Sequence, residues 1–173
     1  LIATASESEE LAREASDDSG VYMVPAFTGL GAPYWNPDVR GALFGISRST
    51  GRAEIVRAVL ESVCYQTHDL FAAMAADGVK PSSLRIDGGM VANNWMVQFL
   101  ADILDLPVDR PEIMETTALG AACLAGLQAG LLGSFEELSG KCRMDARFGP
   151  DMAAPERKRL LDGWHDAVQR VIS

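Results

Sequence analysis

The sequence contains few of the residues that usually bind metal ions. Only two of its 173 residues are histidines and three are cysteines. His68 and His165 are far apart in the sequence, so no metal site is indicated. The cysteines are odd in number, have no Cys-x-x-Cys spacing and lie in apolar or short extended segments; they are Cys64, Cys123 and Cys142. This pattern favours buried, reduced thiols, and we expect a cytoplasmic protein.

Long apolar runs are also missing. None reaches the roughly 18 to 20 consecutive apolar residues of a membrane span. The chain does not open with the basic and then apolar segments of a signal peptide either. We therefore expect no membrane span. The first residue is Leu1 rather than a methionine, from which we expect a piece of a longer protein or a processed product.

Basic residues are scarce relative to acidic ones. The 15 lysines and arginines face 24 aspartates and glutamates, and the net charge at pH 7 is −9. An acidic surface repels phosphate groups, so nucleic acids and anionic membranes are not expected partners. The remaining composition, with 48% hydrophobic residues and no obvious linker or repeat, is that of a soluble globular protein. We expect residues 1–173 to form a single domain.

Hydrophobic patterning predicts an alternation of strands and helices. Helices are predicted at residues 3–16, 52–76, 91–104, 117–130 and 155–172, with a further short helix started by the capping box at residues 134–137. Strands or extended segments are predicted at residues 21–26, 41–47, 83–87, 107–111 and 141–148. This order indicates an α/β domain with a largely parallel sheet flanked by helices.

Three segments leave alternatives open. Residues 27–40 form a long loop with three aromatic residues, which either covers the edge of the core or has a functional role. His68 is better interpreted as a solvated or hydrogen-bonded helix residue than as a catalytic one. The helix at 117–130 is rich in alanine and glycine, which is typical of close packing against a neighbouring helix.

The strand at 83–87 ends in a Gly88-Gly89 turn that leads into the next helix. Ligands of open α/β sheets bind at the carboxyl ends of strands, and glycines let the backbone approach a ligand closely. The first N–H groups of a helix can also bind an anion. A simple turn between strand and helix is the competing interpretation.

Three stretches together resemble the C-terminal half of the FGGY carbohydrate kinases. The first is the loop from Pro25 to Trp35, whose form is similar to that of the family members that phosphorylate glycerol. The second is the signature that runs from Gly41 to Glu61. The third comprises Asp87-Gly88-Gly89 and Asn93-Asn94, followed by residues 115–122.

The resemblance implies an actin-like ATPase fold with two ribonuclease-H-like domains and a ligand cleft between them. This chain corresponds to most of the second domain. The Gly88-Gly89 turn would hold the nucleotide, and Gly89 and Asn93 match the family's nucleotide-contacting glycine and asparagine. Asn93 follows Gly89 by about one helical turn, so its amide is expected to reach a group that lies over the turn. Met90 and Cys123 depart from the family pattern, and Met90 is expected to narrow or shift the adenine site.

The same resemblance implies that ATP, Mg²⁺ and glycerol are used by a full-length kinase that forms dimers or tetramers. The glycerol-binding residues, the catalytic aspartate and a second phosphate-binding turn of the family lie outside this sequence. No catalytic residue is therefore assigned here, and we expect the chain alone to be inactive. Another FGGY sugar kinase and a non-catalytic actin-like nucleotide-binding module remain as alternatives.

Overall fold

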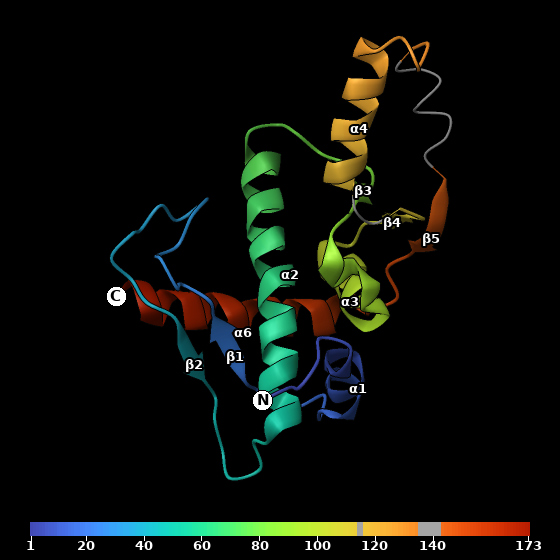
Figure 1. Ribbon diagram of the computed structural model, residues 1–173. Helices are drawn as coiled ribbons and strands as arrows, with labels where there is room; N and C mark the ends of the chain where they lie inside the picture. Colours follow the sequence, from blue (N-terminus) through green and yellow to red (C-terminus); the bar gives the residue numbers. More distant parts are fainter. Residues whose placement is uncertain (114–115, 135–142) are drawn as a thin grey trace.

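The computed structural model describes residues 1–113, 116–134 and 143–173. Helices and strands alternate along the chain, as expected for an α/β domain (Figure 1). The elements are α1 (Glu7–Glu14), β1 (Tyr22–Val24), β2 (Ala42–Phe44), α2 (Arg52–Ala76), β3 (Leu84–Arg85), the 3₁₀-helix η1 (Gly89–Ala92), α3 (Asn94–Leu104), β4 (Val108–Pro111), α4 (Thr116–Gln128), β5 (Met144–Phe148) and α6 (Ala154–Ile172).

The 25-residue helix α2 is the central element, and its bounds are those predicted from the sequence. The helix begins where the backbone N–H of Gly51 donates to the Glu54 carboxylate, at 2.8 Å. A carboxylate in the first turn also interacts favourably with the helix dipole. Helices α1 and α3 and strand β1 all pack against α2, and α6 crosses it in Figure 1.

The core gathers around Tyr65 of α2. Its ring stacks on the indole of Trp164 from α6, with centroids 5.3 Å apart. It also meets the ring of Phe99 from α3 edge-on, at 5.6 Å. Trp164 has no exposed surface, and Tyr65 is buried as well. Such aromatic pairs contribute roughly 0.5–1.5 kcal/mol each beyond the burial of area, so they hold α2, α3 and α6 together.

The strands form two small sheets rather than the largely parallel sheet that was predicted. β1 and β2 pair antiparallel, while β3 pairs parallel with β4 and β4 pairs antiparallel with β5. Among the described strands, only the β3–β4 pair is parallel, so that part of the prediction is wrong. The reason is the connection: β1 returns to β2 through a loop, whereas β3 reaches β4 through α3, the crossover that parallel pairing requires.

Several predicted elements are shorter in the structure. The strand predicted at 41–47 ends at Phe44, since Gly45 adopts a φ of 77° and a side chain at this position would collide with the Gly20 backbone. The helix predicted at 3–16 is confined to Glu7–Glu14. The capping box at Ser134 leads into residues 135–142, which lie outside the described residues, as does Cys142.

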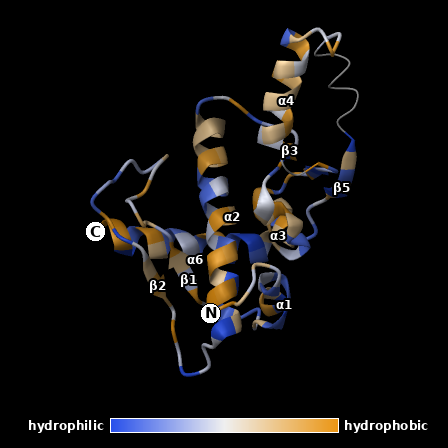
Figure 2. Cartoon of the chain, in the orientation of Figure 1, coloured by the Kyte–Doolittle hydropathy of each residue, from blue (hydrophilic) through white to orange (hydrophobic). Residues whose placement is uncertain are grey.

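Among the described residues, helix α4 has no tightly packed neighbouring helix of the kind that its small residues predicted. None of its described residues is buried, and no atom lies within 4 Å of where a side chain at Gly120 would begin. Figure 1 shows α4 projecting from the end of the molecule near β3, and Figure 2 shows that its surface is largely apolar. Within the described part of the chain, most residues of α4 therefore remain exposed, and the others are only partly buried.

The other expectations about exposure are met only in part. Cys64 is buried, but Cys123 on α4 is half-buried, so the prediction of a buried thiol fails there. None of the described helices combines the length and the apolar character that crossing a membrane requires.

Candidate functional site

The Gly88-Gly89 turn follows β3 directly. Gly88 has φ 91° and ψ 170°, a combination that is essentially open only to glycine. The chain then makes one 3₁₀ turn, with the Val91 N–H donating to the Gly88 carbonyl at 3.2 Å. The side chain of Val91 is buried and fixes the turn on the core.

The helix predicted at 91–104 begins at Asn94 instead. Its cap is Asn93, whose Oδ1 accepts the Met96 N–H at 2.9 Å. The glycines therefore precede a short 3₁₀ turn rather than the first turn of an α-helix. The two glycines therefore do not provide the N–H groups of an α-helix N-terminus that were expected to bind an anion. Any contact of Gly89 with a ligand must come from its own backbone.

The side chain of Asn93 is engaged at both ends. Besides capping α3 with Oδ1, it donates from Nδ2 to the hydroxyl of Ser8, at 3.1 Å. The neighbouring Asn94 N–H donates to the Glu9 carboxylate, at 3.0 Å. Helix α1 is thus bonded directly to the turn from 85 residues away. Nothing in the sequence indicated that Ser8 and Glu9 belong to this site.

Arg110 of β4 fastens the turn to the sheet. Its guanidinium donates to the Val91 carbonyl at 2.9 Å and to the Asn94 side chain at 2.8 Å. The same group forms an ion pair with Asp145 of β5, at 2.7 Å. One side chain therefore ties the turn, β4 and β5 together.

The residue that precedes the turn also connects it to α4. Asp87, which precedes Gly88, accepts a hydrogen bond from the hydroxyl of Thr116, the first residue of α4. This places the start of α4 next to the turn, as Figure 1 also shows.

A cavity of about 330 Å³ opens beside the turn. It is lined by Ala5, Ser6, Ser8, Glu9, Leu60, Gly89, Met90, Ala92 and Asn93. Of the predicted site residues, Gly89 and Asn93 line the cavity. Gly88 does not line it and contributes the backbone conformation of the turn. Both glycines leave open space where a side chain would stand. The hydrogen bond from Arg13 lowers the pKa of Glu9, with a further contribution from the Asn94 N–H, and the Glu9 carboxylate at the rim of the cavity forms an ion pair with Arg13.

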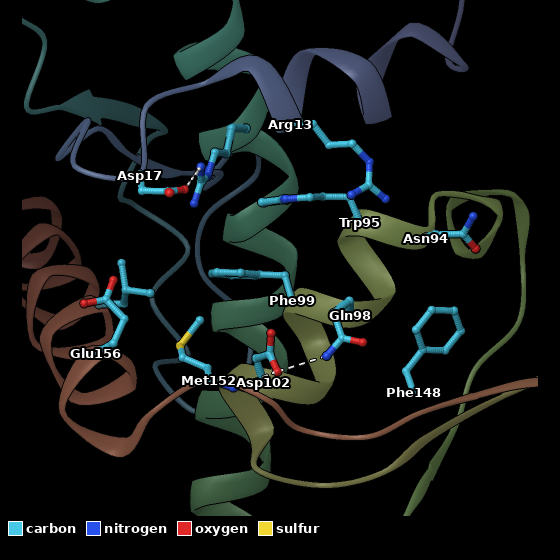
Figure 3. A pocket seen from close by; sticks show the side chains of 12 residues that line it. Arg13, Asp17, Asn94, Trp95, Gln98, Phe99, Asp102, Phe148, Met152 and Glu156 are labelled. Atoms are coloured by element: carbon cyan, nitrogen blue, oxygen red, sulfur yellow. Dashed lines mark hydrogen bonds and ion pairs between the residues drawn. The ribbon is translucent and has the colours of Figure 1, made fainter.

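A larger cavity, of about 630 Å³, lies on the other side of the start of α3. Figure 3 shows Trp95 and Phe99 in its wall, with their rings stacked at 5.3 Å. Its polar side chains are largely paired with one another, as in the bonds from Arg57 to Asp17 and from Gln98 to Asp102. The smaller cavity is lined by Gly89 and Asn93, which the sequence predicted as site residues, so we place the candidate site there.

The long loop at 27–40 is anchored by some residues, such as the buried Leu30, and exposed at others. The hydroxyl of Tyr34 donates to the Asp69 carboxylate of α2, at 2.7 Å. Phe27 and Trp35 are in contrast 71% and 77% exposed. The loop is therefore not a simple aromatic cover over the core.

Comparison with known proteins places this arrangement in a family. The model of the FGGY family of carbohydrate kinases, C-terminal domain, matches residues 2–129. The chain is 61% identical to a glycerol kinase of Rhodospirillum centenum over all of its 173 residues, and 57% identical to glycerol kinase 1 of Pseudomonas aeruginosa. In both comparisons it spans 35% of the relative's length.

Solved structures give the same result. The crystal structure of Plasmodium falciparum glycerol kinase with ADP superposes with a TM-score of 0.86, at 35% identity, over 99% of this chain and 35% of that one. A xylulose kinase from Lactobacillus acidophilus has a TM-score of 0.77 at 23% identity, and so shares the fold. The expected actin-like ATPase fold is thereby confirmed. The chain belongs to the FGGY family of carbohydrate kinases and represents its C-terminal domain.

Proposed function

We propose that this chain is the nucleotide-binding domain of an ATP-dependent glycerol kinase, which converts glycerol and ATP into sn-glycerol 3-phosphate and ADP. The observation that carries the proposal is the open cavity at the Gly88-Gly89 turn of an FGGY C-terminal domain. Relatives that match the chain over nearly its whole length are named glycerol kinases, at 53–61% identity. One similar structure is described as a glycerol kinase with ADP.

In this proposal the nucleotide lies in the cavity between α1 and the turn. Gly88 provides the backbone conformation of the turn, and Gly89 lets the adenosine approach the backbone without meeting a side chain. Asn93 keeps Oδ1 on the helix cap, and Nδ2, which has two N–H donors, offers the one not bonded to Ser8 to the ligand. Met90 lines the same cavity and is 47% exposed, so it is placed to contact the adenine.

The remaining components belong to the complete kinase. Phosphoryl transfer requires a positioned acceptor hydroxyl, a base and Mg²⁺, and we assign no described residue to these roles. Mg²⁺ usually binds through phosphate oxygens and water with few protein ligands, so it would accompany ATP. We propose that glycerol and the base are held by the part of the relatives that this chain does not span. We further propose a cytoplasmic homo-oligomer.

Two alternatives differ from this proposal in a testable way. Another FGGY sugar kinase would use the same nucleotide site with a different acceptor, and the resemblance of the loop at 25–35 to glycerol-phosphorylating members disfavours it. A non-catalytic nucleotide-binding module would bind ATP but support no transfer in any context.

Calorimetry on the chain tests the nucleotide site. Because the proposed cleft includes a part of the relatives that this chain does not span, we expect ADP and ATP to bind weakly, with dissociation constants above the micromolar range. Asn93→Asp keeps the acceptor that caps α3 but removes the Nδ2 donor, and it should weaken ADP binding. Asn36→Asp, in the loop, is the matched control and should not. Micromolar or tighter binding by the chain alone would contradict the half-cleft proposal.

A hybrid protein tests the reaction. This chain would replace the corresponding 35% of the Rhodospirillum centenum glycerol kinase. We expect the hybrid to form glycerol 3-phosphate and the chain alone to form none. Asn93→Asp in the hybrid should raise the KM for ATP more than the KM for glycerol. A folded hybrid that binds ADP but forms no glycerol 3-phosphate would support the non-catalytic alternative.

A further inference from the structure

Both histidines of the chain meet at one buried carboxylate, although 97 positions separate them in the sequence. His68 and Asp69 come from α2, and His165 comes from α6. The Nε2 atom of His165 lies 3.0 Å from Oδ1 of Asp69, and Nδ1 of His68 lies 3.7 Å from the same oxygen. The three atoms all lie within 4.8 Å of one another.

Asp69 is held so that one oxygen faces the imidazoles. Its other oxygen, Oδ2, accepts hydrogen bonds from the Tyr34 hydroxyl and the Trp164 indole N–H, each at 2.7 Å. The Asp69 side chain is only 3% exposed. No lysine or arginine forms an ion pair with it among the described residues. A buried anion without a fixed cation favours a positive partner.

His68 has a ring nitrogen without a partner. Its Nδ1 atom is buried and forms no hydrogen bond, since 3.7 Å to Asp69 Oδ1 is too long for one. The expectation of a solvated or hydrogen-bonded histidine therefore does not hold for this atom. Two ligands of a tetrahedral zinc ion, each about 2.0–2.1 Å from the metal, lie roughly 3.3 Å apart. The two spacings at Asp69 Oδ1, 3.0 and 3.7 Å, lie on either side of that value.

We propose that His68 Nδ1, Asp69 Oδ1 and His165 Nε2 form a binding site for a divalent transition-metal ion of the zinc type. Two imidazoles and one carboxylate suit Zn²⁺, Co²⁺ or Ni²⁺ better than Mg²⁺ or Ca²⁺, which prefer oxygen ligands. His165 is 48% exposed, so the ion can enter from solvent and keep a water as its fourth ligand.

Tyr34 and Trp164 would orient the site without touching the metal. Both bond the carboxylate oxygen that is turned away from the imidazoles, as partners of metal ligands commonly do. The ion would link α2 to α6 directly, and it would link them to the loop at 27–40 through the bond of Tyr34 to Asp69. Since it would bind the folded chain in preference to the unfolded one, it should raise the Tm.

Imidazole ¹⁵N NMR of the whole chain during a Zn²⁺ titration tests the site. With two histidines in the sequence, the spectrum contains two imidazole spin systems. We expect the Nδ1 resonance of His68 and the Nε2 resonance of His165 to shift together and to saturate at one ion per chain. Mg²⁺ at the same concentrations should shift neither. Shifts of only one histidine, or of neither, would overturn the proposal.

Variants distinguish Zn²⁺ binding at the proposed site from nonspecific binding by surface carboxylates. His165→Gln changes an exposed residue and should fold normally, yet it should weaken Zn²⁺ binding by more than about 100-fold. This exceeds the 10–100-fold that loss of an outer partner costs, which is the range expected for Tyr34→Phe. Asp166→Asn, an exposed neighbour on the same helix, is the matched control and should leave the affinity unchanged. Equal affinity of His165→Gln and the parent chain would contradict the assignment.

Discussion

Two adjacent glycines at the turn are required for different reasons. Gly88 adopts φ 91°, a conformation in which a side chain is strained, although nothing crowds it. Gly89 lies in an ordinary 3₁₀ conformation that any residue can adopt. The first glycine is therefore needed by the fold, and the second, in our proposal, by the ligand.

Alanine substitutions should separate these two requirements. We expect Gly88→Ala to lower the free energy of unfolding by about 1–3 kcal/mol, the cost of a residue held in a rare backbone conformation. Gly89→Ala should be neutral or raise it by about 0.4–1 kcal/mol, since it restricts the unfolded chain. Urea unfolding monitored by circular dichroism measures both. Equal destabilisation by the two changes would contradict the assignment of roles.

The cysteines should differ sharply in reactivity. Cys64 has no exposed surface, and burial raises the pKa of its thiol, with a smaller contribution from Glu61. The thiolate is the reactive form, so Cys64 should remain unmodified by iodoacetamide in the native chain at pH 8. Cys123 is half-buried and should react faster. Peptide mapping by mass spectrometry gives both rates, and denatured protein, in which the rates should converge, is the control.

At the level of elements, the start of α2 depends on one carboxylate. Glu54 accepts the N–H groups of Gly51 and Ser16, at 2.8 and 3.4 Å. The N–H groups of Glu54 itself, of Gly51 and of Ser16 lower the pKa of Glu54 below its usual value. The same side chain thereby joins the exit of α1 to the entry of α2.

Replacement of Glu54 should therefore weaken the helix start in a pH-dependent way. We expect Glu54→Ala to cost about 0.5–1 kcal/mol at pH 7, comparable with the loss of a helix cap. Because the folded pKa is lowered, the stabilisation is present above the unfolded pKa near 4.5 and is lost as the pH falls through the folded pKa. Thermal unfolding at pH 7 and pH 3 measures this. A difference between variant and parent that persists undiminished at pH 3 would contradict it.

The sequence predicted helices better than it predicted their partners. The apolar stripe and the acidic first turn located α2 correctly, because periodicity and helix termini are local properties. Strand pairing depends on which segments meet in space, so the sequence did not reveal the antiparallel β1–β2 and β4–β5 pairs. The same limit applies to α4, whose small residues predicted a neighbour that the described chain does not contain.

The sequence also predicted only part of the candidate site. Gly89 and Asn93 were identified from their motif, and both line the cavity. Ser8, which bonds Asn93 from 85 residues earlier, carries no local signal. The same holds for the meeting of His68 and His165, since only the crossing of α6 over α2 brings them together.

For the whole molecule, the main feature is the apolar surface around α4. Leu124 is 59% exposed, Leu131 81% and Ile113 52%. Exposed apolar groups that lie near one another often mark an interface. In the proposed kinase, this surface would face other parts of the protein.

We therefore expect the chain to self-associate as its concentration rises. Leu124→Glu should reduce the association, because a charge on α4 opposes burial of this surface. Val79→Glu, an equally apolar exposed position after α2, is the matched control. Sedimentation velocity over a range of concentrations measures the effect. A strictly monomeric parent chain at high concentration would contradict the prediction.

The contacts of Trp164 also determine when the core can form during synthesis of the chain. Trp164 bonds Asp69 across 95 residues, and α6 supplies the ring that stacks on Tyr65. At about 5–20 residues per second of synthesis, α2 waits roughly 5–20 s for this partner. During that interval the nascent chain carries an open core with an uncovered carboxylate in it. Until α6 has left the ribosome, this part of the core therefore remains open, and α6 is the helix that completes it.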